Sequence, residues 1–296
     1  MKKAIITILF IVLFSVLLYD IYIYFSIKNE SENRLTRHGI QQKLSPVLRY
    51  GDSKKPAILL LHGFGGSPHD FRPLIDQLPE NYTVSAPVLP GHSLGNSKEL
   101  SRYNRLDWRN AAQENTHNLL ERHHEIILCG FSLGGLVALD IAPDFPVHAV
   151  ILINPYTSIP YKPYYILPVE LWVDLLNPFI PYSKKIHSGQ INFPDGRKRY
   201  EPSYWHISLK AYKELQFYSD IISNKTKPLK TNVYFHFSKE DGVSSPEKML
   251  ELASKMNIRK ERIYIWPHSN HNLLYDFDSK DAIDQIIKNI KTSEMH

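Results

Sequence analysis

The strongest constraint on the fold of this chain is a serine between two glycines, in Gly130-Phe131-Ser132-Leu133-Gly134. The run before it, 125–129, is short and apolar, as is typical of a buried parallel strand. The run after it, 135–142, is typical of a helix. The two glycines lack the Cβ atoms that would clash at so sharp a turn. The sequence therefore predicts that Ser132 is held at the top of a sheet, beside the N–H groups that open a helix.

A nucleophilic serine needs a base and a carboxylate that orients the base. The run 231–237 predicts a strand, and Glu240 and Asp241 follow it. In open α/β sheets, active-site groups collect at the carboxyl ends of strands. We favour Asp241 over Glu240, because the Asp-Gly pair indicates a tight turn that aims a short carboxylate inward.

Two histidines follow the next predicted strand, 262–266, and either could be the base. We favour His271 over His268, because it begins a helix-like run after a Ser-Asn turn. A metal site at this His-x-x-His pair is disfavoured, since no third ligand is found at helical spacing. No metal is predicted.

A glycine-rich loop follows a third predicted strand, 57–61, and reads His62-Gly63-Phe64-Gly65-Gly66. Such a loop lets backbone N–H groups approach a ligand oxygen closely. We expect the N–H groups of Phe64 and Leu133 to stabilise an oxyanion. The loop has neither GxGxxG spacing nor a closing Lys-Ser/Thr pair, which excludes a phosphate-binding loop. No cofactor is predicted.

Strand and helix patterns alternate along most of the chain. Strands are expected near 46–50, 57–61, 82–87, 125–129, 147–153, 231–237 and 262–266, and helices near 68–78, 107–122, 133–142, 245–256 and 280–291. This alternation predicts an α/β fold with a mostly parallel sheet and helices on both faces. The single cysteine, Cys129, excludes an intramolecular disulfide.

Together with the segment 86–92 and the pair Asp107-Trp108, these motifs resemble the α/β-hydrolase superfamily. The closest resemblance is to bacterial carboxylesterases and monoacylglycerol lipases, over about residues 45 to 290 without the middle insert. The resemblance implies a serine hydrolase that cleaves carboxylic esters through an acyl-enzyme. It assigns Ser132 as nucleophile, Asp241 as orienting carboxylate and His271 as base.

Two alternatives remain open for the function. One is a thioesterase or amidase, because the same triad serves several acyl derivatives. The other is a non-catalytic, hydrolase-like binding domain tethered to a membrane, which a missing triad position would favour; none is missing. Nucleic acid is not expected as a partner, since no fold that binds it is recognisable. The expected partner is a small-molecule or lipid ester.

The resemblance does not extend to the insert of about residues 156–230. An unstructured loop of this length is improbable inside a compact domain, so we expect a cap with its own helices, near Tyr164–Leu176 and Ser208–Ile222. The insert is rich in aromatic residues, which favours an apolar roof over the acyl-binding cleft. The alternative for each aromatic residue is that it only packs in the core of a small lid and does not contact the acyl chain.

The amino-terminal residues 4–27 carry one charge, Asp20, in 24 residues. A run of this length and composition predicts a membrane-spanning helix. No small-residue cleavage site follows, which favours an uncleaved signal anchor over residues 1–27, before a linker at 28–44 and a hydrolase domain at 45–296. Short positive amino-terminal tails usually stay in the cytoplasm, so the catalytic domain is expected outside it.

Overall fold

The computed structural model of the protein describes residues 2–36, 43–93, 97–162, 166–185, 190–201 and 204–293. Its main sheet has the strand order β1-β3-β2-β4-β5-β8-β9. The strands are β1 (Val47–Arg49), β2 (Ala57–Leu61), β3 (Val84–Ala86), β4 (Ile126–Phe131), β5 (Val147–Ile153), β8 (Asn232–Ser238) and β9 (Ile263–Trp266). Only the pairing of β1 with β3 is antiparallel. Each expected strand is present, so the predicted α/β sheet is confirmed.

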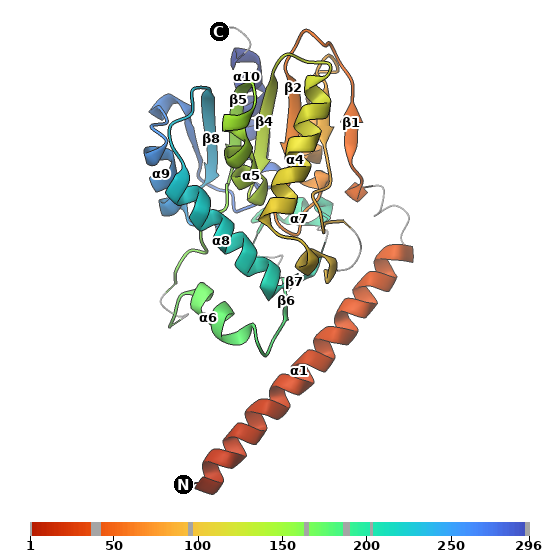
Figure 1. The fold of residues 1–296 in the computed structure, drawn as a ribbon, viewed down its shortest axis with the longest axis vertical. Helices are drawn as coiled ribbons and strands as arrows, with labels where there is room; N and C mark the ends of the chain where they lie inside the picture. Colours follow the sequence, from red (N-terminus) through yellow and green to blue (C-terminus); the bar gives the residue numbers. More distant parts are fainter. Residues whose placement is uncertain are drawn as a thin grey trace.

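Helices cover both faces of this sheet (Figure 1). They are α3 (Arg72–Ile75), α4 (Arg105–Leu120), α5 (Leu133–Ile141), α9 (Pro246–Lys255) and α10 (Ser279–Ser293), with short 3-10 turns η1 (Pro68–Phe71), η2 (Glu99–Arg102), η3 (Ala142–Asp144), η6 (Lys260–Arg262) and η7 (Leu273–Tyr275). Successive strand residues point to opposite faces. In β2, Leu59 and Leu61 therefore pack with α4 and α5, whereas Ile58 and Leu60 pack with α3 and α10. This two-sided burial explains why the strand sequence is apolar throughout.

The insert between β5 and β8 forms a cap, which lies at one end of the sheet (Figure 1). Its elements are α6 (Val169–Leu176), β6 (Tyr182–Lys184), α7 (Pro194–Arg199), β7 (His206–Ser208) and α8 (Leu209–Lys225). The helix expected at Ser208–Ile222 corresponds to α8. The other expected helix begins later, at Val169, and Tyr164 and Tyr165 lie outside the described residues. The antiparallel β6–β7 pair was not predicted from the sequence.

The amino-terminal segment forms one helix, α1 (Lys2–Thr36). Within the described residues, no helix has a stretch long and apolar enough to cross a membrane. The transmembrane anchor expected over residues 1–27 is therefore not supported. In α1, Asp20 interrupts the apolar run 4–27, and the charged residues Lys28 and Glu30 follow it.

One side of α1 packs against the cap (Figure 1). Ile23, Ile27 and Glu30 are its buried positions, at the spacing of a single helical face. The Glu30 carboxylate accepts the backbone N–H of Trp205 at 2.6 Å and lies 2.6 Å from Nδ1 of His206. The polar linker expected from residue 28 thus begins inside a helix that contacts the cap.

Removal of the Glu30 carboxylate should loosen the β6–β7 pair, because it removes the hydrogen-bond partner of the buried His206 and the acceptor of the Trp205 N–H. Leaving a buried hydrogen-bonding group without its partner costs about 1–3 kcal/mol. We expect Glu30→Ala to speed amide hydrogen exchange in residues 182–184 and 206–208, measured by mass spectrometry. Glu32→Ala is the matched control, since the Glu32 side chain is 66% exposed. Equal exchange in both variants would contradict the packing of α1 on the cap.

Candidate active site

Ser132 lies in the sharp turn between β4 and α5, with φ 53° and ψ −116°. A Cβ atom at Gly130 would lie 2.3 Å from the carbonyl oxygen of Gly134. A Cβ atom at Gly134 would lie 1.8 Å from the carbonyl oxygen of Leu61, on β2. Only glycine fits at either position, so the expected strand–turn–helix is confirmed for the reason that the sequence indicated.

The structure brings Ser132, Asp241 and His271 together at the carboxyl ends of β4, β8 and β9. Nε2 of His271 lies 3.0 Å from Oγ of Ser132. Nδ1 of His271 lies 2.8 Å from Oδ2 of Asp241. All three residues are buried. The arrangement can pass the serine proton to the imidazole while the carboxylate holds the other ring nitrogen.

The carboxylate and the imidazole are each fixed by their own turns. Oδ1 of Asp241 accepts the backbone N–H groups of Val243 and Ser244, each at 2.8 Å. This Asx turn leaves Oδ2 of Asp241 for His271. Oδ1 of Asn270 accepts the backbone N–H of His271 at 2.8 Å and that of Gly242 at 2.9 Å. The two catalytic loops are thereby joined through one amide side chain.

The two rival residues lie elsewhere. Glu240 is exposed, and its carboxylate accepts the side-chain amide of Asn192. His268 is exposed as well, and its backbone N–H donates to Asp278. Neither has a hydrogen bond to Ser132 or His271 among the described residues, so the geometry favours Asp241 and His271.

The expected oxyanion loop lies against the serine. A Cβ atom at Gly63 would be 3.2 Å from Cβ of Ser132. Among the hydrogen bonds of the described residues, none uses the backbone N–H of Phe64 or that of Leu133. Both predicted donors therefore remain available to an incoming oxygen, which is what an oxyanion site requires.

His62 fixes the start of this loop. Its Nε2 accepts the backbone N–H of Leu89 at 2.9 Å, so the ring proton lies on Nδ1, which donates to the carbonyl of Gly63 at 2.9 Å. Burial lowers the pKa of His62 to about 4, and the imidazole is neutral at pH 7. His62 is thus a structural residue of the loop.

Two polar residues of the site were not predicted from the sequence. Asn154 follows β5 with φ 41°, donates to the carbonyl of His271 at 2.6 Å and accepts the N–H of Ser238 at 2.7 Å. An asparagine before a proline at a strand end is the local signal that could have indicated it. Asp70, on η1, accepts the N–H of Gly63 at 3.1 Å and the hydroxyl of Tyr200 at 3.0 Å.

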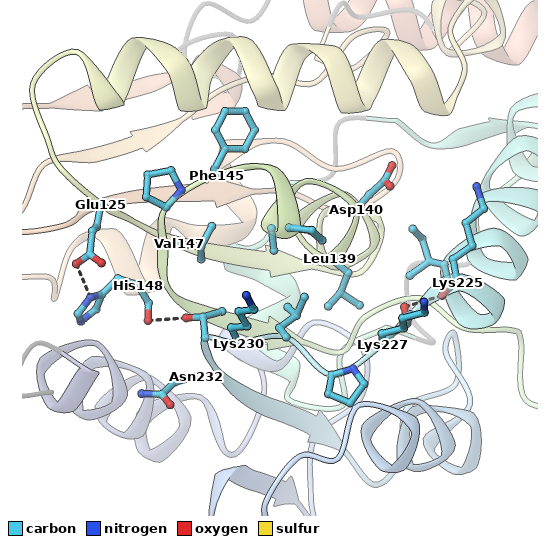
Figure 2. Close-up of a pocket in the computed structure, with 18 of the residues that line it drawn as sticks. Glu125, Leu139, Asp140, Phe145, Val147, His148, Lys225, Lys227, Lys230 and Asn232 are labelled. Carbon is cyan, nitrogen blue, oxygen red and sulfur yellow. Dashed lines mark hydrogen bonds and ion pairs between the residues drawn. The ribbon is translucent and has the colours of Figure 1, made fainter.

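A cavity of about 890 Å³ lies away from these residues. Figure 2 shows it between the end of α5, the start of β5 and the segment after α8, with Lys227 and Lys230 among its lining residues. Val147 and His148, at the amino end of β5, line the cavity, so it lies at the end of the sheet opposite the catalytic residues. The cavity is therefore not part of the candidate active site. Within the described part of the chain, no cluster of three or more His, Cys, Asp or Glu side chains could hold a metal ion.

A family model described as "Alpha/beta hydrolase family" matches residues 58–283. The 30 kDa subunit of magnesium chelatase from Rhodobacter capsulatus is 36% identical over 108 residues, 36% of this chain and 37% of that protein. A thermostable monoacylglycerol lipase from Bacillus sp. strain H-257 is 33% identical over 113 residues, 38% of this chain and 45% of that enzyme. The chain thus spans less than half the length of these relatives.

A solved structure of the monoacylglycerol lipase from Paleococcus ferrophilus superposes with a TM-score of 0.69. The superposition covers 84% of this chain and 99% of that chain, at 18% identity, and at this identity it shows the fold alone. The predicted resemblance to bacterial carboxylesterases and monoacylglycerol lipases is confirmed.

The buried Asp70 makes stability depend on pH. Burial raises its pKa from 3.8 to about 6. Between these values the native state binds a proton that the unfolded state has released, so stability falls as the pH rises through this window. Above pH 6 the full cost is present, and two pKa units correspond to about 3 kcal/mol at most.

Because asparagine does not titrate, the stability of Asp70→Asn relative to the parent should increase between pH 4 and pH 7. Urea unfolding of both proteins at the two pH values measures the change. A stability difference that is the same at both pH values would contradict the raised pKa.

Proposed function

Because the chain belongs to the alpha/beta hydrolase family, we propose that it is a serine hydrolase that cleaves carboxylic esters through an acyl-enzyme. One observation carries the proposal: the continuous contacts from Ser132 Oγ to His271 Nε2, at 3.0 Å, and from His271 Nδ1 to Asp241 Oδ2, at 2.8 Å. A buried hydroxyl, imidazole and carboxylate in this order form the arrangement that activates serine for acyl transfer.

In the first half of the reaction, His271 takes the proton of Ser132 as Oγ attacks the ester carbonyl carbon. Asp241 accepts the Nδ1 proton of His271, which keeps the tautomer that leaves Nε2 basic and stabilises the imidazolium. The N–H groups of Phe64 and Leu133 donate to the oxyanion of the tetrahedral intermediate. A single donor of this kind commonly contributes about 3–4 kcal/mol to the transition state.

In the second half, the imidazolium of His271 gives its proton to the oxygen of the leaving alcohol, and the C–O bond breaks. Water then enters, His271 takes one of its protons, and the resulting hydroxide attacks the acyl carbon. The tetrahedral intermediate collapses, the bond to Ser132 Oγ breaks, and Oγ regains its proton from His271. The products are one carboxylic acid and one alcohol, and the enzyme returns to its starting state.

The substrate class that we propose is an aliphatic ester such as a monoacylglycerol. The resemblance to a monoacylglycerol lipase supports this choice. A cap rich in aromatic residues supports it as well, since such a cap suits an acyl chain. A thioesterase or an amidase would use the same three residues, so the acyl derivative has to be identified by experiment.

The first test removes the proposed catalytic groups. Ser132→Ala and His271→Ala should each lower kcat on a p-nitrophenyl ester by at least about 10⁴-fold, because triad members act as a unit. His268→Ala is the matched control, and its activity should equal that of the parent, since His268 is exposed. Circular dichroism checks that each variant is folded. Substantial ester hydrolysis by folded Ser132→Ala would refute the proposed function.

The second test compares leaving groups on one acyl chain. The parent enzyme should hydrolyse a glyceryl monoester with a higher kcat/KM than the matched thioester or amide. The length of the acyl chain is then varied. Because each methylene bound in an apolar pocket changes the activation free energy by about 1–3 kcal/mol, the chain length at which kcat/KM stops rising gives the length of the pocket. If the amide or the thioester is the better substrate, the proposed ester class is wrong although the triad remains.

A further inference from the structure

Asp70 is a buried carboxylate outside the triad that contacts both the oxyanion loop and the cap. It lies on η1, directly after the glycine-rich loop, and 4% of its surface is exposed. Carboxylates are rarely buried unless their oxygens are paired. The two oxygens of Asp70 have different partners: one lies seven residues before Asp70 in the chain and the other lies 130 residues after it.

On the loop side, Oδ2 of Asp70 accepts the backbone N–H of Gly63 at 3.1 Å. Gly63 immediately precedes Phe64, whose N–H is the proposed oxyanion donor. A Cβ atom at Gly66 would lie 2.2 Å from the same Oδ2, so the loop backbone is wrapped closely around this oxygen. The direction of the Phe64 N–H thus depends on a backbone that Asp70 holds.

On the cap side, Oδ1 of Asp70 accepts the hydroxyl of Tyr200 at 3.0 Å. Tyr200 directly follows α7, and its ring packs on that of Tyr275 with a centroid distance of 5.2 Å. A second cap residue, Lys185, places Nζ 3.8 Å from the position that a Cβ atom at Gly65 would take. The cap therefore approaches the oxyanion loop directly through Lys185, and it contacts Asp70, which binds that loop, through Tyr200.

Several groups around Asp70 influence its charge. Burial raises its pKa to about 6, whereas the Gly63 N–H, the Lys185 ammonium, the Tyr200 hydroxyl and His271 each act to lower it. The phenol of Tyr275 is a further neighbour whose pKa Asp70 raises. The carboxylate is thus mainly ionised at pH 7, at a cost to stability. Carboxylates whose pKa is strongly shifted by burial and specific neighbours cluster at functional sites, so Asp70 is a candidate for a functional role.

We propose that Asp70 is a positioning residue that couples the seating of the cap to the geometry of the oxyanion loop. When the cap places Tyr200 against Asp70, the Tyr200 hydroxyl and the Gly63 N–H both donate to the carboxylate. The carboxylate then fixes the backbone of the oxyanion loop. The coupling rests on the proposed function, since it assigns a role only if Phe64 donates to an oxyanion. Among the described residues, Asp70 has no hydrogen bond to Ser132, Asp241 or His271, so it is assigned no chemical step.

The loop side is tested with Asp70→Ala and Asp70→Asn. Oxyanion donors act mainly in the transition state, so Asp70→Ala should lower kcat on a p-nitrophenyl ester by about 10-fold or more with KM nearly unchanged. Asp70→Asn should regain most of kcat. Its amide oxygen accepts the Gly63 N–H, and its NH₂ group donates to the Tyr200 oxygen. Rates are divided by the fraction of enzyme that a fluorophosphonate labels after long incubation, which removes the effect of misfolded protein.

The cap side is tested with Tyr200→Phe, which removes one hydroxyl and keeps the ring. The matched control is Tyr218→Phe. Tyr218 is a buried cap residue on α8, and its hydroxyl donates to the carboxylate of Asp140, on α5, at 2.8 Å. Tyr200→Phe should lower kcat severalfold, and Tyr218→Phe should leave it unchanged. This comparison decides the cap side even if Asp70→Ala does not fold.

Each outcome separates this proposal from the proposed function. If Asp70→Ala keeps the kcat of the parent while Ser132→Ala is inactive, the positioning role is overturned and the serine mechanism stands. Equal losses in Asp70→Ala and Asp70→Asn would overturn the role of the Gly63 hydrogen bond. Equal kcat in Tyr200→Phe and Tyr218→Phe would overturn the coupling to the cap. An active Ser132→Ala would overturn both proposals.

Discussion

The close approach of β2, β4 and α5 at Gly134 is the constraint on which the site depends. A Cβ atom there would lie 1.8 Å from the carbonyl oxygen of Leu61, the last residue of β2. The helix therefore starts directly beside the end of β2, and the loop that leaves β2 must run alongside Ser132. This contact places Gly63, the second residue of that loop, beside Ser132. The parallel register then brings the ends of β8 and β9, with Asp241 and His271, to the same edge.

The parts of the site that depend on local chain geometry could be predicted from the sequence. The strand–turn–helix around Ser132 needs two glycines at fixed positions, and the sequence shows both. The choice of Asp241 over Glu240 rested on the Asp-Gly turn. The structure gives the physical reason, because Oδ1 of Asp241 caps its own turn and Oδ2 is left for His271. The central strands β2 and β4 were predictable because each is buried along its whole length and is apolar throughout.

The contacts that the sequence did not reveal join distant segments without a local pattern. Asp70 and Tyr200 are 130 residues apart, and Glu30 and His206 are 176 residues apart. The strands of the cap have three residues each, too few for an alternating pattern to be recognised. The composition of the amino-terminal segment predicted a membrane anchor, whereas the structure shows a helix with a face that contacts the cap. For Asp70 and Glu30, a buried carboxylate is satisfied by a partner that only the tertiary fold supplies.

The central claim is that Ser132 is the nucleophile activated by His271. The most direct measurement is peptide mapping by mass spectrometry after reaction with a fluorophosphonate, which forms a stable covalent adduct with an activated serine. The account predicts one adduct per chain, on the peptide that contains Ser132, and almost no adduct in the His271→Ala variant over the same time. An adduct on another residue, or equal labelling of Ser132 without His271, would contradict it.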